Sequence, residues 1–365
     1  MRRVARAWLA LLIASGLAAC SMTPLSPGED QARQDTHTSV SKAEAAHALK
    51  GQVLGRNERL AIYLPAPGET LPQILPPLAL HFLGSADLAW RIADFNKLDA
   101  DPAAAPHPLL IPLVEHNPLG VYSDRYQTIP ILCYHRFGRA NGGATSNKMT
   151  VSTAAFAEQL SWLQRNGYHV LKLADLRAWL DGQRTLPLKS VVITVDDGYA
   201  SFFHQAYPLL KQFNMPATLF VYTDFIGAGD GVDWLELQAM SRAGLVDVQS
   251  HSRTHRNLIE HPSSESDAAY QQALFNEIKA PRDLLAQRLS TPQTLYAYPY
   301  GDANEAVLAM LGKHGYQLAV TVNAGGNAFF AQPLMLRRTM IFGDMSLDDF
   351  KARLQISRLT GAHAP

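Results

Sequence analysis

Strand-like apolar runs and amphipathic segments alternate along the chain from residue 128 to about residue 358. Strands are expected at 129–133, 170–173, 191–195, 217–222, 245–248, 294–298, 318–322 and 336–341. Helices, with apolar residues three and four positions apart, are expected at 153–165, 235–242, 267–289 and 304–313. This alternation predicts an α/β domain with a parallel sheet, and the number of strands favours a barrel.

Polar side chains follow several of these strands directly. Asp196 and Asp197 follow the run at 191–195, His251 and His255 come just after the run at 245–248, and His135 comes after the first run. In a barrel of parallel strands, catalytic groups gather where the strands end and the loops begin. The strand at 294–298 likewise ends in Pro299-Tyr300-Gly301-Asp302. The pattern therefore predicts that the polar groups after these four strands lie at one rim.

Two histidines four residues apart and a carboxylate from another strand are a common ligand set for a catalytic divalent metal. A second carboxylate beside the ligating one would supply a general base. Taken separately, Asp196-Asp197-Gly198 could instead form a helix N-cap, and the histidines could be ordinary loop side chains. Their joint occurrence at strand ends favours a metal site.

A smaller α+β module is expected at residues 59–114, in the order strand, Pro-Gly turn, helix, second helix ending near Asn96, and closing strand. The segments at 63–71, 89–96 and 108–112 resemble a LysM module, a family that binds glycans rich in N-acetylglucosamine. That resemblance makes Gly68, Thr70 and Asn96 candidate glycan-binding residues. Residues 75–78 depart from the pattern and are expected to interrupt the first helix. The alternative is a spacer whose small core is filled by Trp90 and Phe95.

The N-terminus has the features of a secretory signal, with Arg2, Arg3 and Arg6 before an apolar run that is too short to span a bilayer. Residues 17–20, Leu-Ala-Ala-Cys, resemble a bacterial lipoprotein box. The resemblance implies a signal peptide at 1–20 and lipidation of Cys20. It also implies a membrane anchor, and Ser21 favours the outer membrane, facing the periplasm.

Residues 21–58 are expected to be a flexible tether and residues 115–127 a linker, leaving 128–360 for the large domain. The second cysteine, Cys133, is expected to be a buried free thiol. With 32 basic and 32 acidic side chains the net charge is zero, which argues against a nucleic-acid partner.

Three motifs of the large domain resemble the polysaccharide deacetylases of carbohydrate esterase family 4: residues 194–199, residues 251–255 and residues 298–301. The resemblance extends over about residues 128 to 358. It implies a distorted (β/α) barrel that removes acetyl groups from N-acetylglucosamine polymers with a divalent metal. Transferred by motif, Asp196 is the general base, the metal ligands are Asp197, His251 and His255, and the Tyr300 backbone N–H stabilises the oxyanion. Tyr199 and Pro299 are auxiliary candidates.

The chain departs from that family where an arginine usually opens the third motif, because Ala297 stands there. It also lacks the late motif that usually supplies the general acid. A branch of the family acting on poly-N-acetylglucosamine has the same third motif and a histidine after its first strand, which makes His135 the candidate acid. Either Arg337 or Arg338 could replace the missing arginine by orienting Asp196.

The sequence therefore predicts a metal-dependent de-N-acetylase of a β-linked N-acetylglucosamine polymer, with exopolysaccharide favoured over peptidoglycan and a polymer-export assembly as a possible partner. Zinc fits the ligand set best, and cobalt, nickel or iron would also be accepted. Two alternatives stay open: a non-catalytic glycan-binding lipoprotein with an inactive barrel, and an esterase that removes O-acetyl groups.

Overall fold

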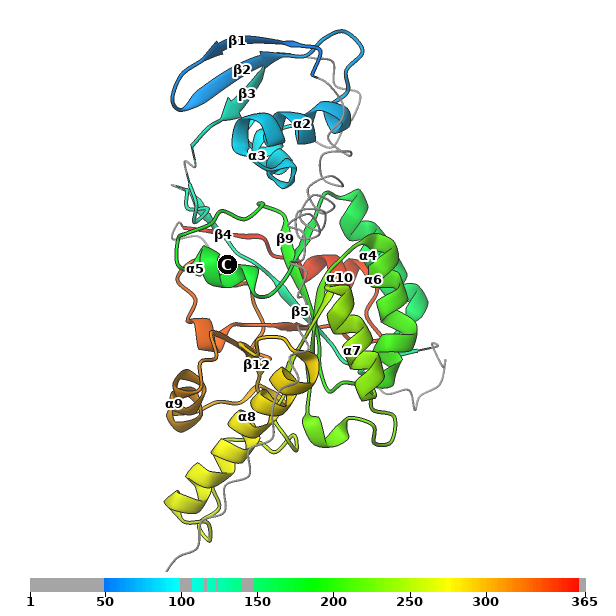
Figure 1. Cartoon of the computed structure of the whole chain (residues 1–365), viewed down its shortest axis with the longest axis vertical. Coiled ribbons are helices and arrows are strands. Elements are labelled where there is room, and N and C mark those ends of the chain that lie inside the picture. The colour runs from blue at the N-terminus through cyan, green and yellow to red at the C-terminus, as the bar shows by residue number, and fades with distance from the viewer. Residues whose placement is uncertain (1–48, 99–106, 115–116, 123, 139–147, 361–365) are drawn as a thin grey trace, which may run out of the picture.

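The computed structural model describes residues 49–98, 107–114, 117–122, 124–138 and 148–360. A small module, blue in Figure 1, sits at one end of a larger α/β domain. The predicted signal peptide and Cys20 lie outside the described residues. Within those residues, none of the helices combines the length and apolarity that a membrane span requires.

The small module is a three-stranded antiparallel sheet covered by helices. Its strands lie in the order β1 (Gln52–Arg56), β2 (Leu60–Leu64) and β3 (Leu109–Pro112). Its helices are α2 (Leu71–Leu83), the 3-10 turn η1 (Ala86–Leu88) and α3 (Ala89–Phe95). The core between these two layers includes Ala61, Tyr63, Ile74, Leu78, Ile92 and Ile111.

Two sequence-based expectations for this module are wrong. Residues 52–56 belong to a strand and not to the tether, because their backbone pairs with β2 although most of their side chains are exposed. Residues 75–78 do not interrupt the first helix, since α2 runs through Pro76 and Pro77. Pro77 and Leu78 are buried on the face that covers the sheet, so apolar burial offsets the backbone hydrogen bonds that proline cannot make.

The large domain is built on a curled parallel sheet, in the order β13-β12-β11-β10-β9-β5-β14, with β8 paired to the start of β9. All pairings within this sheet are parallel. The strands are β5 (Ile131–Tyr134), β8 (His169–Leu171), β9 (Ser190–Val195), β10 (Ala217–Val221), β11 (Val246–Ser250), β12 (Leu295–Ala297), β13 (Leu318–Val320) and β14 (Thr339–Met340). Each of the eight predicted strands is present.

A single parallel bridge, Val320 to Leu336, joins the β13 edge to the segment that leads into β14. The Leu336 N–H donates to the Ala319 carbonyl at 2.9 Å, and the Thr321 N–H donates to the Leu336 carbonyl at 2.8 Å. The two edges of the sheet thus meet over one residue. The predicted distorted barrel is confirmed.

Helices cover the outside of this sheet (Figure 1). The four predicted helices are α4 (Thr153–Arg165), α7 (Trp234–Ala243), α8 (Asp267–Leu289) and α9 (Glu305–Lys313). Three further helices are too short for a clear period and were not predicted: α5 (Asp175–Leu180), α6 (Tyr207–Phe213) and α10 (Leu347–Ala352). Shorter elements are the strands β6 (Arg136–Gly138) and β7 (Thr150–Ser152), the π-helical turn η2 (Phe202–Ala206) and the 3-10 turns η3 (Thr223–Phe225), η4 (Pro299–Gly301) and η5 (Pro333–Met335).

The predicted linker, 115–127, ends inside the large domain. Its last residues form β4 (Arg125–Gln127), which pairs antiparallel with the C-terminal strand β15 (Ser357–Leu359). The buried Gln127 side chain donates to the Pro187 carbonyl at 2.7 Å. This segment has no apolar alternation to mark it as a strand, and its pairing partner lies at the other end of the domain.

Asn327 joins three parts of the barrel wall, and its removal is expected to destabilise the domain. Its buried side chain accepts the Arg337 N–H at 2.8 Å and donates to the carbonyls of Arg337, at 2.9 Å, and Ile129, at 3.2 Å. Asn327→Ala leaves the N–H and the carbonyl of Arg337 without these partners, whereas the Ile129 carbonyl keeps the backbone N–H of residue 327, and the change is expected to lower the free energy of unfolding by about 3 kcal/mol. Denaturant unfolding measures this, with the exposed Gln272→Ala as the control. Equal stability of the two variants would contradict this role.

Candidate active site

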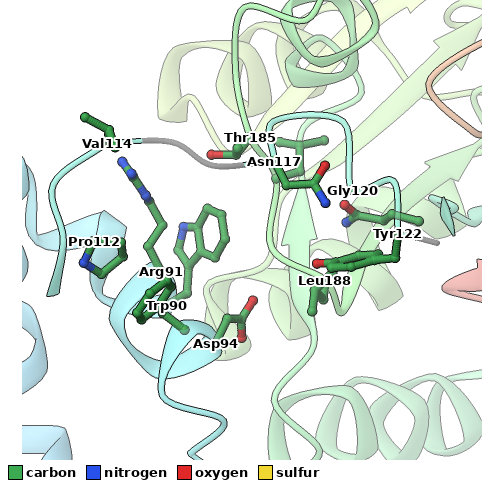
Figure 2. Close-up of a pocket in the computed structure, with 13 residues that line it drawn as sticks. Trp90, Arg91, Asp94, Pro112, Val114, Asn117, Gly120, Tyr122, Thr185 and Leu188 are labelled. Atoms are coloured by element: carbon green, nitrogen blue, oxygen red, sulfur yellow. The ribbon is translucent and has the colours of Figure 1, made fainter. Parts of the chain in front are cut away.

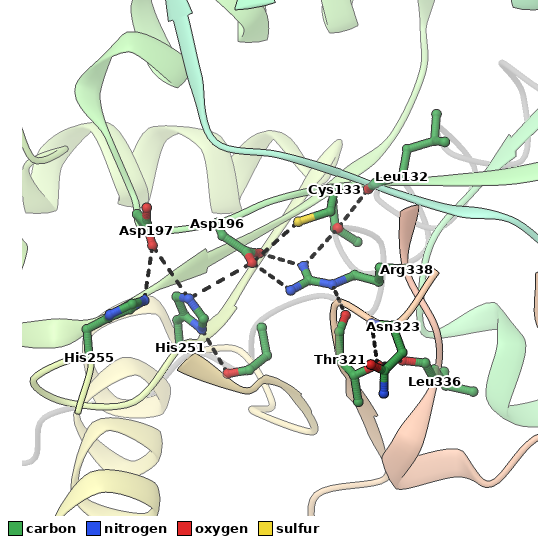
Figure 3. Close-up of polar contacts among 12 residues, drawn as sticks. Leu132, Cys133, Asp196, Asp197, His251, His255, Thr321, Asn323, Leu336 and Arg338 are labelled. Carbon is green, nitrogen blue, oxygen red and sulfur yellow. Dashed lines mark hydrogen bonds and ion pairs between the residues drawn. The ribbon is translucent and has the colours of Figure 1, made fainter. Parts of the chain in front are cut away.

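The first part of the site is the sharp turn after β9. Asp196 and Asp197 follow the last residue of that buried strand, and Asp197 has φ 73° while Gly198 has φ 81°. A Cβ at Gly198 would lie 2.8 Å from Val221 Cγ1, so glycine is required by both its backbone angle and its packing. The turn directs the two neighbouring carboxylates into the site (Figure 3).

The second part is the loop after β11, which includes His251 and His255. The buried carboxylate of Glu277, on α8, accepts the backbone N–H of Arg253 at 3.1 Å and that of Thr254 at 2.9 Å. The hydroxyl of Ser252 accepts the His255 N–H at 2.9 Å. These contacts fix the loop, so that both imidazoles face the carboxylates.

Asp197, His251 and His255 form a cluster that could hold a metal ion, and their ligand atoms all lie within 4.8 Å of one another. The Nε2 atoms of His251 and His255 lie 3.5 and 3.4 Å from Asp197 Oδ1. Figure 3 shows the carboxylate between the two rings. The structure therefore brings together the three ligands that the sequence predicted.

The chemistry of this donor set fits a divalent metal. The Nδ1 of His251 lies 2.8 Å from the Ala297 carbonyl, so Nδ1 carries a hydrogen, and Nε2, which faces Asp197, is the ring nitrogen left to bind a metal. Burial and the nearby His251 lower the pKa of His255, which favours the neutral ligand form. Burial by itself raises the pKa of Asp197, but the hydrogen bond from His251 outweighs it, and the net pKa is lowered.

Arg338 holds the other carboxylate, Asp196. The Nη1 of Arg338 donates to Asp196 Oδ1 and its Nη2 donates to Oδ2, both at 2.6 Å. The guanidinium is fully buried, and its remaining donors reach the Thr321 carbonyl at 2.8 Å and the Thr194 hydroxyl at 3.2 Å. Of the two arginines considered in the sequence, Arg338 is the one that contacts Asp196.

Arg337, its neighbour, points elsewhere. Its Nη1 donates to the Ala324 carbonyl at 3.2 Å on the exposed side of the barrel. The two residues lie in the segment between Leu336 and β14, where Arg337 is exposed and Arg338 is buried, so only Arg338 enters the site. The expectation that Arg337 is a candidate partner of Asp196 is thus wrong.

The charge of Arg338 determines the ionisation of Asp196. Burial raises the pKa of Asp196, but the guanidinium outweighs this effect and holds the pKa well below its usual range. Cys133 lies on the other side, with Sγ 3.5 Å from Asp196 Oδ2. It is a buried free thiol, as predicted, and burial raises its pKa well above the usual value.

His135 follows β5 and approaches Asp196 from a third direction. A nitrogen of its ring, Asp196 and Cys133 place their nearest polar atoms within 4.8 Å of one another. Its Nδ1 is buried and has no hydrogen-bond partner among the described residues. Burial lowers its pKa. An unpartnered imidazole nitrogen beside the carboxylates is available to a bound substrate.

Tyr300 and Tyr199 lie around the mouth of the cluster. Tyr300 has φ 61°, is 60% exposed, and places its ring centroid 4.8 Å from that of His255. It belongs to the first turn of η4, where N–H groups have no acceptor within the helix. Tyr199 instead supports Arg136, whose guanidinium carbon lies 3.6 Å from the Tyr199 ring centroid. Pro299 is buried beneath Tyr300 in the same turn.

Left-handed backbone angles concentrate in the site. Asp197, Ser252, His255 and Tyr300 are four of the non-glycine residues with positive φ in the described chain. Such angles cost of order 1–3 kcal/mol each and persist only where the surroundings impose them. Here the barrel core and the Glu277 hydrogen bonds provide that support.

The candidate glycan-binding residues of the module have structural contacts. Gly68 has φ 86° in the turn before α2, and Thr70 is the N-cap of α2 in a capping box with Gln73. The Asn96 side chain joins α3 to β3, since it donates to the carbonyls of Ile92 and Leu110 and accepts the Leu110 N–H at 2.9 Å. A glycan-binding role for these three residues stays a prediction.

Three contributors were not predicted: Thr194, Glu277 and the Ala297 carbonyl. Cys133 was predicted as a buried thiol but not as a neighbour of Asp196. Thr194 and Cys133 stood within predicted strands, where buried polar side chains are a signal that they face something polar. Glu277 lies within a long predicted helix and carried no such signal, because its partners come from a loop 23 and 24 residues away.

Comparisons with known proteins agree with this geometry. A family model for polysaccharide deacetylases matches residues 183–319. The chain is 27% identical over 241 residues to the poly-beta-1,6-N-acetyl-D-glucosamine N-deacetylase of Escherichia coli strain K12, covering 56% of this chain and 36% of that protein. It is also 27% identical over 237 residues to the Bacillus subtilis protein YxkH, described as a polysaccharide deacetylase, covering 64% of this chain and 79% of that one.

Two solved structures have the same barrel. The Streptococcus pyogenes deacetylase PplD, in complex with acetate, is 26% identical with a TM-score of 0.57, over 62% of this chain and 98% of that one. IcaB from Ammonifex degensii is 25% identical with a TM-score of 0.55, over 63% and 97% of the two chains. The family match includes Asp196 as well as the cluster residues Asp197, His251 and His255. Residues 183–319 are thus similar to the polysaccharide deacetylases, and the residues of the predicted motifs meet at the rim of the barrel.

Proposed function

We propose that the protein is a metal-dependent de-N-acetylase of a β-linked N-acetylglucosamine polymer, with a secreted exopolysaccharide as the favoured substrate. The observation that carries this proposal is the Asp197, His251 and His255 cluster beside an Asp196 that Arg338 keeps ionised. The relatives from Escherichia coli and Staphylococcus aureus are named as deacetylases of poly-beta-1,6-N-acetyl-D-glucosamine. The chain spans 36% of the length of the Escherichia coli relative, so this substrate is part of the proposal.

In the proposed mechanism, Asp197, His251 and His255 hold the metal. When bound, a divalent cation supplies a Lewis acid that polarises an amide carbonyl and favours the deprotonation of water. Zinc fits two imidazoles and one carboxylate with open positions. Cobalt, nickel and iron share this ligand preference.

The protein's own residues carry the proton transfers. Asp196 accepts a proton from the attacking water as the new C–O bond forms at the acetamide carbon. The Tyr300 N–H donates a hydrogen bond to the developing oxyanion. His135 supplies a proton to the sugar nitrogen as the C–N bond breaks, so that acetate and a free amine leave.

Two further proposals concern the rest of the chain. We infer that the module binds N-acetylglucosamine-containing glycan and that lipidated Cys20 tethers the protein to the outer membrane, facing the periplasm. The module supports the first idea by its order of strands and helices. Peptidoglycan is the second candidate substrate, because it too contains N-acetylglucosamine, and a polymer-export assembly is a candidate partner.

The protein is expected to release acetate from poly-β-1,6-N-acetylglucosamine. Asp196→Asn removes the base while keeping the shape of the side chain, and it is expected to lower kcat by about 10²- to 10⁴-fold. Acetate and free amines are measured in parallel, with peptidoglycan and an O-acetylated polysaccharide as alternative substrates. Faster release from the ester substrate would identify an esterase. No acetate from any substrate by the metal-loaded protein would favour the non-catalytic alternative.

Metal binding is expected to depend on the three predicted ligands. His255→Ala removes one of two imidazoles and is expected to weaken zinc binding at least about tenfold, since ligand number sets affinity. Isothermal titration of the metal-stripped protein with zinc measures the affinity directly. His204→Ala, whose side chain is 59% exposed and lies outside the cluster, is the matched histidine control. Equal zinc affinity of both variants would place the metal elsewhere.

Breaking the buried ion pair is expected to cost both stability and activity. Arg338→Met leaves Asp196 buried without its counter-ion and is expected to lower the free energy of unfolding by about 3–5 kcal/mol. The exposed neighbour gives the control, Arg337→Met, for which little change is expected. Adding Asp196→Asn to Arg338→Met removes the unpaired charge, so the double variant should be more stable than Arg338→Met alone. If the double variant lost as much free energy of unfolding as the two single variants together, the two residues would not be coupled.

A further inference from the structure

A crevice separates the small module from the barrel domain, and nothing in the proposed catalytic mechanism uses it. Its volume is about 300 Å³. Figure 2 shows that side chains from both parts of the protein face it. The module contributes Trp90, Arg91 and Asp94, and the connecting segment and barrel contribute Asn117, Tyr122 and Leu188.

Trp90 is directed into this crevice and not into the module. The buried side chain of α3 is Ile92, and neither Trp90 nor Phe95 belongs to the hydrophobic cluster of the module. The expectation that these two aromatics fill the module core is therefore wrong, and the spacer role itself stays a prediction. Phe95, at 41% exposed, and Tyr122, at 37%, also present apolar surface here. Aromatic side chains are gathered at a place where the module's own packing does not need them.

The polar tips of two of these aromatic side chains are free. Neither the indole N–H of Trp90 nor the hydroxyl of Tyr122 makes a hydrogen bond to a residue within the described ranges. Such groups usually find a partner where they are partly buried. Asp94 is held differently, because it accepts a hydrogen bond from the Leu188 backbone, and burial raises its pKa.

Charge in the crevice is balanced. Arg91 and Asp94 both line it, so the site presents one basic and one acidic side chain. A balanced, aromatic lining gives no advantage to an anion or a cation. It suits a neutral ligand that has an apolar face and a hydrogen-bonding edge. A pyranose ring has both, since its C–H groups form one face and its hydroxyl and acetamide groups form the rim.

We propose that this crevice is a second glycan-binding site, which takes a neutral N-acetylated sugar unit of the same polymer that the barrel deacetylates. The proposal rests on the proposed function for the identity of the polymer. The sugar packs on the Trp90 indole, and its polar groups bond to the indole N–H and to Tyr122. The site differs from the module's predicted glycan-binding residues Gly68 and Thr70, which do not line the crevice.

The position of the crevice gives it a distinct role. Leu188 precedes β9, whereas Asp196 follows it, so the crevice and the catalytic rim lie at opposite ends of this strand. Six residues of strand span roughly 20 Å. One polymer molecule can occupy both sites only by running along the outside of the barrel. Binding in the crevice therefore retains long polymers and gives no advantage to short oligomers.

Binding is tested first, without catalysis, in full-length protein that carries Asp196→Asn. Poly-β-1,6-N-acetylglucosamine is titrated against this protein and against the same protein with Trp90→Ala added. The affinity is expected to fall about fivefold or more. Trp90→Phe should retain most of the affinity, because it keeps an aromatic face. Phe330→Ala is the control, since Phe330 is 66% exposed and lies in another pocket.

Kinetics with active protein then test the dependence on chain length. The substrates are the long polymer and a trimer of β-1,6-linked N-acetylglucosamine. In Trp90→Ala, the ratio of kcat/KM for the polymer to kcat/KM for the trimer is expected to fall about fivefold, because the KM for the polymer rises. An unchanged ratio and unchanged affinity would overturn the second site. An equal loss on polymer and trimer would also overturn it, because it would show a general effect on the catalytic rim.

The two proposals fail in distinguishable ways. If the wild-type protein releases acetate but Trp90→Ala has no effect on binding or on the ratio, the second site is wrong and the deacetylase stands. If Trp90 governs polymer binding but no acetate appears, the binding site stands and the proposed activity is wrong. Thermal unfolding of Trp90→Ala and Phe330→Ala checks that both variants are folded.

Discussion

The buried ion pair between Arg338 and Asp196 is the interaction on which the active site depends. A carboxylate that is nearly inaccessible to water can stay ionised only with a close counter-charge. The guanidinium supplies it through two parallel hydrogen bonds and uses its other donors on Thr321 and Thr194. The pair thus ties the end of β9 to the segments on either side of the barrel closure. The ionised state of Asp196 and the closure of the sheet therefore both depend on this ion pair.

The barrel holds the reactive groups by imposing backbone angles that the residues would not adopt alone. Asp197, His255 and Tyr300 have positive φ on the loops after three different strands. Each strand ends in a fully or largely buried residue, so the strands fix where each loop starts. The Glu277 carboxylate then fixes the histidine loop from outside the sheet. The packing of the barrel core offsets the free-energy cost of these strained backbone angles.

Local patterns predicted the eight strands and the longer helices because apolar periodicity survives in the sequence wherever a face is buried. The motifs predicted the metal cluster because its members follow strands of one sheet. The choice between Arg337 and Arg338 could not be made, since both lie just before the two-residue strand β14 and the sequence does not show which of them faces the barrel interior. Strand β1 and the direction of the Trp90 side chain could not be predicted either. The strand depends on its pairing with β2, and the Trp90 side chain faces the barrel domain, and neither contact can be read from the local sequence.

The order of residues along the chain has a consequence for biosynthesis. Arg338 lies 142 residues after Asp196, and the strand β15 that pairs with β4 comes later still. A nascent chain that has completed β9 carries Asp196 without its counter-ion, and the barrel has no closing edge. The carboxylate can be buried in its ionised form only after nearly the whole domain has been made. A protein truncated before residue 338 is therefore not a smaller enzyme but a chain that cannot complete its barrel.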